Sequence, residues 1–238
     1  MVPVIAIIPS RGGSKRIPMK SLELLGNQSL IARTIHLAQN ADIFSRILVS
    51  TDSREIADEA IKSGAEVLNL RDEYFDDYSP VSLATIHTLR SVIQMENSLA
   101  KSTVVQLMPN CPFLSLETLL NCIDSQKNSS EQSLISCVRV DPINWYAFTL
   151  ANHEPRWIAD GIDLTARTQD NPPLFVPTGS VWIATASYLI ENQSFYGKKY
   201  RFHEISQLDG YDIDTVEQLN LARIIYRGKI GNIQGAKD

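Results

Sequence analysis

The feature that most constrains this 238-residue chain is a repeated alternation of short apolar runs with longer segments of helical periodicity. The runs Val4–Pro9, Arg46–Ser50 and 103–108 have the length and apolar character of strands buried inside a sheet. Between them, segments such as 29–41 carry apolar residues on one helical face. This order predicts an α/β fold with a doubly wound, mostly parallel sheet.

The other expected elements continue the same order. We expect helices over 53–63, 81–94, 116–126 and 215–227, and strands over 66–70, 134–140, 179–184 and 200–205. The rhythm breaks over 141–177, which are rich in aromatic residues and proline and contain no long helical pattern. We therefore predict one domain over 1–228 with an inserted arm or subdomain at 141–177. Residues 229–238 are expected to form a flexible tail.

The loop after the first strand concentrates positive charge. It contains Arg11, Lys15, Arg16 and Lys20, together with Gly12 and Gly13, before the first acidic residue, Glu23. Ligands of open parallel sheets bind beyond the carboxyl ends of the strands. Glycines let the backbone approach a ligand, and its N–H groups with nearby cations suit a polyphosphate. Neither the Walker nor the dinucleotide glycine pattern is present, and a solvated basic loop is the alternative.

The whole-chain properties narrow the function classes. A net charge of −5 disfavours a nucleic-acid-binding surface, so the basic loop needs a local explanation. No apolar stretch approaches the length of a membrane span, and the first residues do not resemble a signal peptide. Cys111, Cys122 and Cys137 form no C-x-x-C pair, so no zinc or redox motif is indicated. We expect a cytoplasmic protein without a nucleic-acid or membrane partner.

Two acidic residues near the end of the chain are candidate metal ligands. Asp212 and Asp214 are separated by one residue, so in a strand both carboxylates would point to the same face. Paired hard oxygens suit Mg²⁺ bound to substrate phosphates. The alternative is a turn and a helix N-cap before Thr215.

Asp52 and Glu55 have the spacing of a capping box that opens the helix over 53–63.

Five segments together resemble one enzyme family. They are RGGSKRIPMK after the first strand, VSTDS, MPNCPFL, ARTQD and YDIDT, in this order along the chain. They resemble the signature segments of the acylneuraminate cytidylyltransferases, the CMP-sialic acid synthetases, which include enzymes for legionaminate, pseudaminate and Kdo. The resemblance covers nearly the whole chain and implies a Rossmann-like nucleotide-diphospho-sugar transferase fold.

The resemblance also implies a reaction and its residues. CTP and a sialic-acid-like 3-deoxy-2-ulosonic acid, a 2-keto sugar acid, would give a CMP-sugar and pyrophosphate for cell-surface glycan synthesis. The catalytic residues would be Lys20, Asp212 and Arg11. The nucleotide would be bound by Arg11, Gly12, Gly13, Lys15, Lys20, Ser82 and Asn110, and the sugar by Arg167 and Gln169. Asp212 and Asp214 would hold Mg²⁺, with Mn²⁺ as an alternative, in a homodimer whose insert reaches the neighbouring subunit.

Two departures from the family pattern limit the substrate prediction, the first for the cytosine base and the second for the sugar. Met108 stands where many relatives have glutamine, and Thr178 stands where they often have asparagine. A nine-carbon sugar acid is our first expectation. The alternatives are another sugar nucleotidyltransferase, such as a CMP-Kdo-type enzyme, and a non-catalytic nucleotide-binding module.

Overall fold

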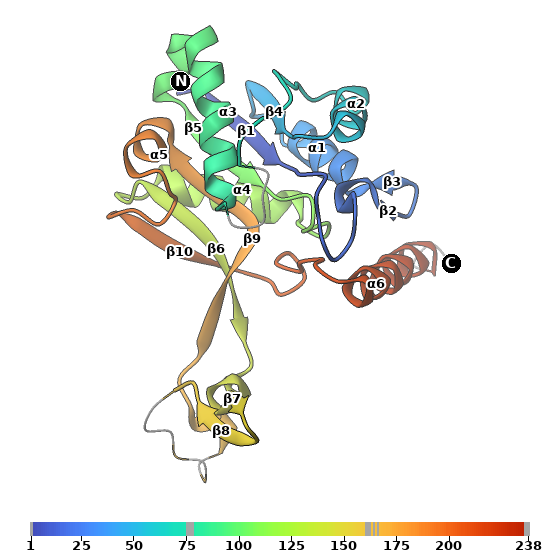
Figure 1. The fold of residues 1–238 in the computed structure, drawn as a ribbon, viewed down its shortest axis with the longest axis vertical. Helices are drawn as coiled ribbons and strands as arrows, with labels where there is room; N and C mark the ends of the chain where they lie inside the picture. The colour runs from blue at the N-terminus through green and yellow to red at the C-terminus, as the bar shows by residue number, and fades with distance from the viewer. Residues whose placement is uncertain (1, 75–78, 160–162, 164, 166, 236–238) are drawn as a thin grey trace.

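A computed structural model of the chain describes residues 2–74, 79–159, 163, 165 and 167–235, and its centre is a six-stranded sheet (Figure 1). The strands are β1 (Val4–Pro9), β4 (Arg46–Ser50), β5 (Thr103–Leu107), β6 (Ser133–Val140), β9 (Leu174–Thr185) and β10 (Tyr200–Ile205). Their order is β10-β6-β9-β5-β1-β4, and only β9 runs against its neighbours among them. The predicted mostly parallel α/β fold is confirmed.

Helices cover both faces of this sheet. The helices α1 (Leu30–Asn40), α2 (Arg54–Lys62) and α4 (Leu116–Lys127) share one apolar core, whereas α3 (Val81–Met95) and α5 (Ala186–Asn192) share the other. In β1, Ala6 and Ile8 face the first core, and Ile5 and Ile7 face the second. Because all four side chains are fully buried, this strand has the continuous apolar sequence of a doubly covered sheet.

A third, smaller core attaches the end of the chain. Here α6 (Val216–Gly235) packs beside the short pair β2 (Leu24–Leu25) and β3 (Gln28–Ser29). Leu25, Leu30, Phe113, Ile213 and Leu219 are buried in it. Because Ile213 belongs to this core, the residues on either side of it, Asp212 and Asp214, are carried to the start of α6. No helix of the described residues has the length and apolar character needed to cross a membrane.

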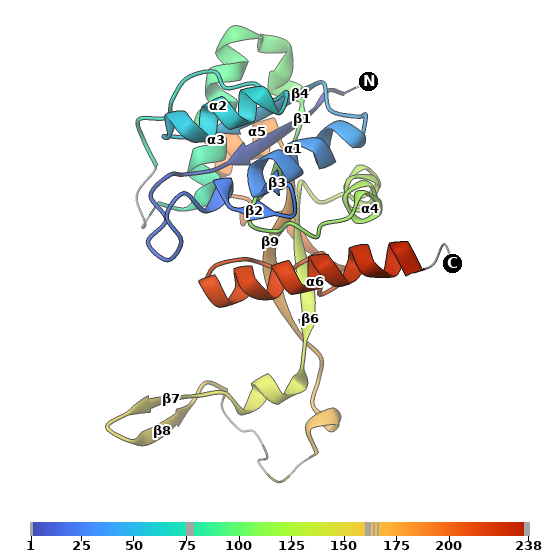
Figure 2. The same cartoon turned by 90° about the vertical axis from the view of Figure 1, so that its right-hand side faces the viewer.

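An arm projects from the body on two long strands (Figures 1 and 2). Beyond a register shift next to Ile135, β6 and β9 pair from Cys137 with Pro177 out to Val140 with Leu174. The arm carries the short helices η3 (Pro142–Tyr146) and η4 (Thr168–Asp170) and the hairpin β7 (Phe148–Ala151) with β8 (Glu154–Trp157). The short helices and the hairpin of the arm therefore lie within the predicted insert, 141–177. The strand β9 begins at Leu174, inside that insert and five residues before the expected strand over 179–184.

Several local predictions differ from the structure. The expected strand over 66–70 is wrong, because only Glu66 bridges to Leu48. The helix α5 was not predicted, and α6 runs to Gly235, eight residues beyond its expected end at 227. The capping box of Asp52 and Glu55 is also wrong. Ser53 caps α2 by accepting a hydrogen bond from the backbone of Ile56, which leaves Asp52 for another role.

Candidate active site

A cavity of about 520 Å³ lies beyond the carboxyl ends of β1 and β5. This volume is in the range of small-molecule binding sites. Its lining comprises Pro9, Ser10, Arg11, Ser14, Lys15, Arg16, Lys20, Ser21, Arg71, Tyr74, Ser79, Val81, Ala84, Met108, Pro109, Asn110 and Asp214. The cavity thus brings together five residues assigned from the resemblance, Arg11, Lys15, Lys20, Asn110 and Asp214, from opposite ends of the chain.

The basic loop is held in place through its backbone. The N–H of Gly12 donates a hydrogen bond of 2.9 Å to Oδ1 of Asp52, at the carboxyl end of β4. The carbonyl of Gly12 accepts bonds from Ser14 and Met19. A Cβ at Gly12 would lie 3.1 Å from that of Ser53, so the loop is tightly packed at this point. Asp52 therefore fixes the loop, which explains why it does not cap α2.

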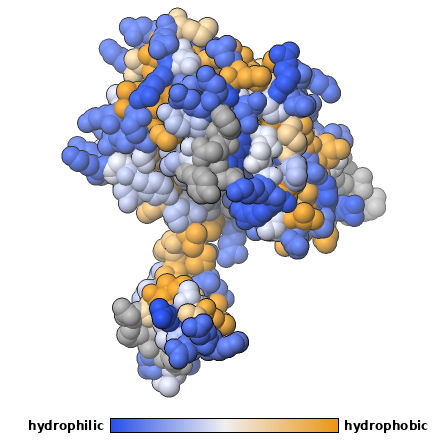
Figure 3. Space-filling view, in the orientation of Figure 1, coloured by the Kyte–Doolittle hydropathy of each residue, from blue (hydrophilic) through white to orange (hydrophobic). Residues whose placement is uncertain are grey.

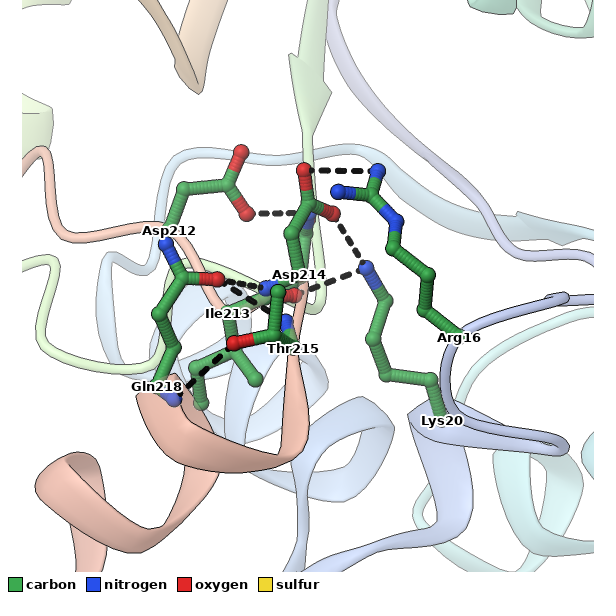
Figure 4. A network of polar contacts seen from close by, with 8 residues as sticks. Arg16, Lys20, Asp212, Ile213, Asp214, Thr215 and Gln218 are labelled. Atoms are coloured by element: carbon green, nitrogen blue, oxygen red, sulfur yellow. Dashed lines mark hydrogen bonds and ion pairs between the residues drawn. The ribbon is translucent and has the colours of Figure 1, made fainter.

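Two cations of the loop, Lys20 and Arg16, contact Asp214 directly (Figure 4). Lys20 Nζ lies 2.9 Å from Asp214 Oδ1 and donates a second bond of 2.7 Å to the carbonyl of Ile213. Arg16 donates to the other oxygen of Asp214 at 3.1 Å. Gln218 Oε1 accepts the N–H groups of Asp214 and Thr215 at the start of α6. The two charged segments thus share one cluster although they are almost 200 positions apart.

The two acidic residues have different environments. Residues 211–214 form no strand, so the expected strand geometry is wrong, yet both carboxylates point to the same side in Figure 4. Burial and the negative charge of Asp214 raise the pKa of Asp212 to about 6. Burial alone would also raise the pKa of Asp214, but Lys20 and Arg16 hold it below its usual value. Lys20 and Arg16 therefore pair directly with Asp214 and not with Asp212.

The donor atoms around Asp212 fit a hard divalent cation. The described residues contain no group of three histidine, cysteine or acidic side chains suited to a metal, so this site offers only two carboxylates. Asn110 Nδ2 donates to Asp212, while Asn110 Oδ1 is buried without a hydrogen-bond partner in the structure. An ion that keeps waters and binds substrate phosphates needs few protein ligands. The oxygens of Asp212, Asp214 and Asn110 suit Mg²⁺ in this role.

Arg71 is a cavity residue that the sequence analysis missed. Its side chain is only 6% exposed, and Nη1 donates to both the carbonyl and the hydroxyl of Ser50 at 3.0 Å. Burial lowers its pKa, and its Nε has no hydrogen-bond partner in the structure. A buried guanidinium on a cavity wall is suited to an anion or a carbonyl oxygen. Its position after the apolar run 66–70, at the carboxyl edge of the sheet, was the available signal.

Six other assigned residues do not line this cavity: Gly12, Gly13, Asp212, Ser82, Arg167 and Gln169. Ser82 is buried in the first turn of α3, where Val81 and Ala84 line the cavity instead. Arg167 and Gln169 lie on the arm at η4, and Arg167 pairs with Asp170 at 3.2 Å. Figures 1 and 2 show the arm directed away from the body. Within one chain, the structure does not bring the assigned sugar residues to the nucleotide cavity.

Three of the known proteins that this chain resembles are named for cytidylyl transfer to sugar acids. CMP-N,N'-diacetyllegionaminic acid synthase of Legionella pneumophila is 35% identical, with 89% of this chain and 91% of that protein covered. Pseudaminic acid cytidylyltransferase of Campylobacter jejuni is 26% identical, with 94% and 96% covered. A solved CMP:2-keto-3-deoxy-manno-octonic acid synthetase, complexed with CTP, shares the fold with a TM-score of 0.71. It is 13% identical, and the match covers 95% of this chain and 99% of that one.

The family model for cytidylyltransferases matches residues 5–229. This range includes the basic loop, the segment around Asn110 and the two late acidic residues. The chain belongs to the cytidylyltransferase family and is a nucleotidyltransferase.

Proposed function

We propose that this enzyme transfers CMP from CTP to a sialic-acid-like 3-deoxy-2-ulosonic acid and releases pyrophosphate. The observation that carries the proposal is the single cavity in which the four-cation loop meets Asp214, with Asp212 beside it. The relatives support the acceptor class, because they are named for legionaminic and pseudaminic acids. The 35% identity makes a legionaminic-type acid the first substrate to test.

The basic loop supplies the charge that a triphosphate requires. Nucleotidyl transfer depends mainly on positioning and on neutralising phosphate oxygens. Arg11 and Lys15 line the cavity for the β- and γ-phosphates. At Gly13 an added Cβ would meet nothing within 4 Å, so the loop backbone is open there, whereas the N–H of Gly12 is donated to Asp52. Lys20 lies deeper, beside Asp214, where it can neutralise charge on the α-phosphate and on the departing pyrophosphate.

The reaction forms one bond and breaks one. The anomeric hydroxyl oxygen of the sugar acid bonds to the α-phosphorus, the bridge between α- and β-phosphates breaks, and the hydroxyl proton passes to water or a base. Bound Mg²⁺, or Mn²⁺, would neutralise phosphate oxygens and acidify that hydroxyl. Asp212 and Asp214 would hold the ion, and Asn110 orients Asp212 through its amide.

We also infer that the enzyme works as a homodimer through its arm. Large apolar side chains on the arm are exposed, among them Phe148, Leu150, Trp157 and Ile158, and Figure 3 shows apolar surface on the stalk and arm. An isolated two-stranded hairpin is marginally stable in water, so a second copy is a reasonable cover. In that arrangement Arg167, with Gln169, would bind the sugar carboxylate in the neighbouring subunit's cavity. The cytoplasm is the expected location.

Pyrophosphate release measured with CTP and a panel of sugar acids tests the proposal. We expect turnover with a nine-carbon acid of the legionaminic, pseudaminic or neuraminic type. Turnover only with Kdo, or only with another nucleotide, would move the assignment to a different sugar nucleotidyltransferase. Binding of CTP without any turnover would favour a non-catalytic nucleotide-binding module.

A further inference from the structure

The lining of the cavity is not cationic throughout. The basic loop contributes Arg11, Lys15 and Lys20, whereas residues 71–84 contribute Tyr74, Val81 and Ala84 beside Arg71 and Ser79. If the triphosphate lies along the cations, as the proposed function requires, the base must lie against the remaining wall. An aromatic and aliphatic surface fits the flat face of a base, and the buried guanidinium of Arg71 beside it is suited to a carbonyl oxygen of that base.

Tyr74 is held in this wall at a conformational cost. Its backbone φ is 56°, in the left-handed region that a bulky residue rarely adopts. Such strain persists only where the surroundings fix it, and it concentrates at functional sites. In this conformation Tyr74 is half-buried and lines the cavity.

A histidine on α3 that does not itself line this cavity contacts the ring of Tyr74. The centroids of Tyr74 and His87 are 6.1 Å apart, with an interplanar angle of 68°, which is an edge-to-face contact. His87 lies three residues after Ala84, so both are on adjacent turns of the same helix face. The helix that lines the cavity with Ala84 therefore also supports the tyrosine.

We propose that Tyr74 is a base-stacking residue of the nucleotide site, and that His87 is a positioning residue that keeps its ring in place. Stacking supplies affinity without reading the edges of the base, since every base has a π-face. Tyr74 therefore strengthens binding of any nucleoside triphosphate and leaves the choice of cytosine to polar groups. This inference rests on the proposed function for the location of the triphosphate.

The test compares two probes in the full-length protein by calorimetry with magnesium chloride present. CTP carries a base, whereas inorganic tripolyphosphate offers the phosphates alone. Tyr74→Asn removes the ring and suits the left-handed backbone, because asparagine tolerates that region. Tyr74→Phe retains the aromatic face, and Tyr200→Asn removes an exposed ring on β10 as a matched control.

We expect Tyr74→Asn to weaken CTP about tenfold, within the range known for base–aromatic stacking. Tripolyphosphate should change less than about twofold, UTP should weaken by the same factor as CTP, and Tyr74→Phe should recover most of the lost affinity. His87→Ala should give a smaller loss for CTP and none for tripolyphosphate.

Two results would overturn the inference. The first is unchanged CTP affinity in Tyr74→Asn, and the second is an equal loss for CTP and tripolyphosphate, which would assign the ring to the shape of the whole cavity. The wild-type protein and its variants could bind CTP and tripolyphosphate as expected while the wild type turns over no sugar acid. That result would refute the proposed reaction and leave the role of Tyr74 intact. Failure of wild type to bind CTP would refute both.

Discussion

Replacing Asp212 by asparagine should stabilise the metal-free protein while it abolishes turnover. Asparagine has the same shape as aspartate and retains an oxygen that can accept the hydrogen bond from Asn110. What it removes is a negative charge that is partly buried beside the charge of Asp214. The substitution therefore measures how the buried charge affects folding stability while the packing of the site stays the same.

The size of the gain follows from the pKa of Asp212. A pKa raised from 3.8 to about 6 favours the folded state when the group is protonated. That contribution is complete below about pH 4 and is lost as the pH rises through 6. At pH 8 the ionised carboxylate costs at most about 3 kcal/mol, and about 1–2 kcal/mol after screening by solvent. In a protein of this size, that corresponds to a melting temperature higher by about 2–8 °C.

The assay is thermal unfolding in EDTA at pH 8 and pH 4.5, with Asp214→Asn as the matched control. The pKa of Asp214 is lowered, so its ionised form stabilises the fold above its ordinary pKa and loses that effect as the pH falls. Asp214→Asn should therefore destabilise at pH 8, whereas Asp212→Asn stabilises. Two results would refute this reasoning: a lower melting temperature of Asp212→Asn at pH 8, or an equal rise at both pH values. Either would show that ionisation of Asp212 does not destabilise the folded protein.

Three further predictions concern other parts of the molecule. Lys20→Ala should lower kcat by about 10²–10³ with a smaller change in the CTP KM; a change in KM alone would make Lys20 a ground-state ligand. Asp52→Ala should raise the CTP KM several-fold by releasing Gly12, while Asp52→Asn, which retains an acceptor, should have a smaller effect; equal KM values would show that the loop needs no such anchor. Leu150→Ser with Trp157→Ser should shift the protein toward monomer in light scattering without unfolding the body, and an unchanged mass would contradict an interface through the arm.

Much of the fold was predictable because it depends on local patterns. The bounds of β1 and β4 agree with the predicted strands, since each is a short apolar run ended by polar residues. The run over 66–70 is also largely apolar, and its backbone hydrogen-bonds to β4 at Glu66. Beyond that point, residues 68–70 line a cavity of about 310 Å³ together with Val49 and Ser50 and form no strand. Strand formation there depended on tertiary pairing, which composition does not reveal.

The site shows the same division between local and distant causes. The clustering of the basic loop was visible in ten residues, and the carboxyl-edge rule placed it at a cavity. The role of Asp52 was not visible, because its partner Gly12 is 40 positions away and a capping box was the nearer explanation. The contact of Asn110 with Asp212 spans 102 positions. Contacts of this kind arise only when the crossovers of the sheet bring loops together.

The ion pairs also explain how an acidic protein keeps a cationic loop ready for a polyanion. In this structure Asp214 pairs with both Lys20 and Arg16 and balances one of their two positive charges, so these cations are held at the cavity without a substrate. A triphosphate bound with a divalent cation would replace both sets of partners. Its phosphate oxygens would pair with Lys20 and Arg16, and the metal ion would pair with Asp214. Either ligand alone would leave one half of the pair uncompensated, Asp214 with the nucleotide or the two cations with the metal. We therefore expect the nucleotide to enter together with a divalent cation, if the proposed metal site is correct.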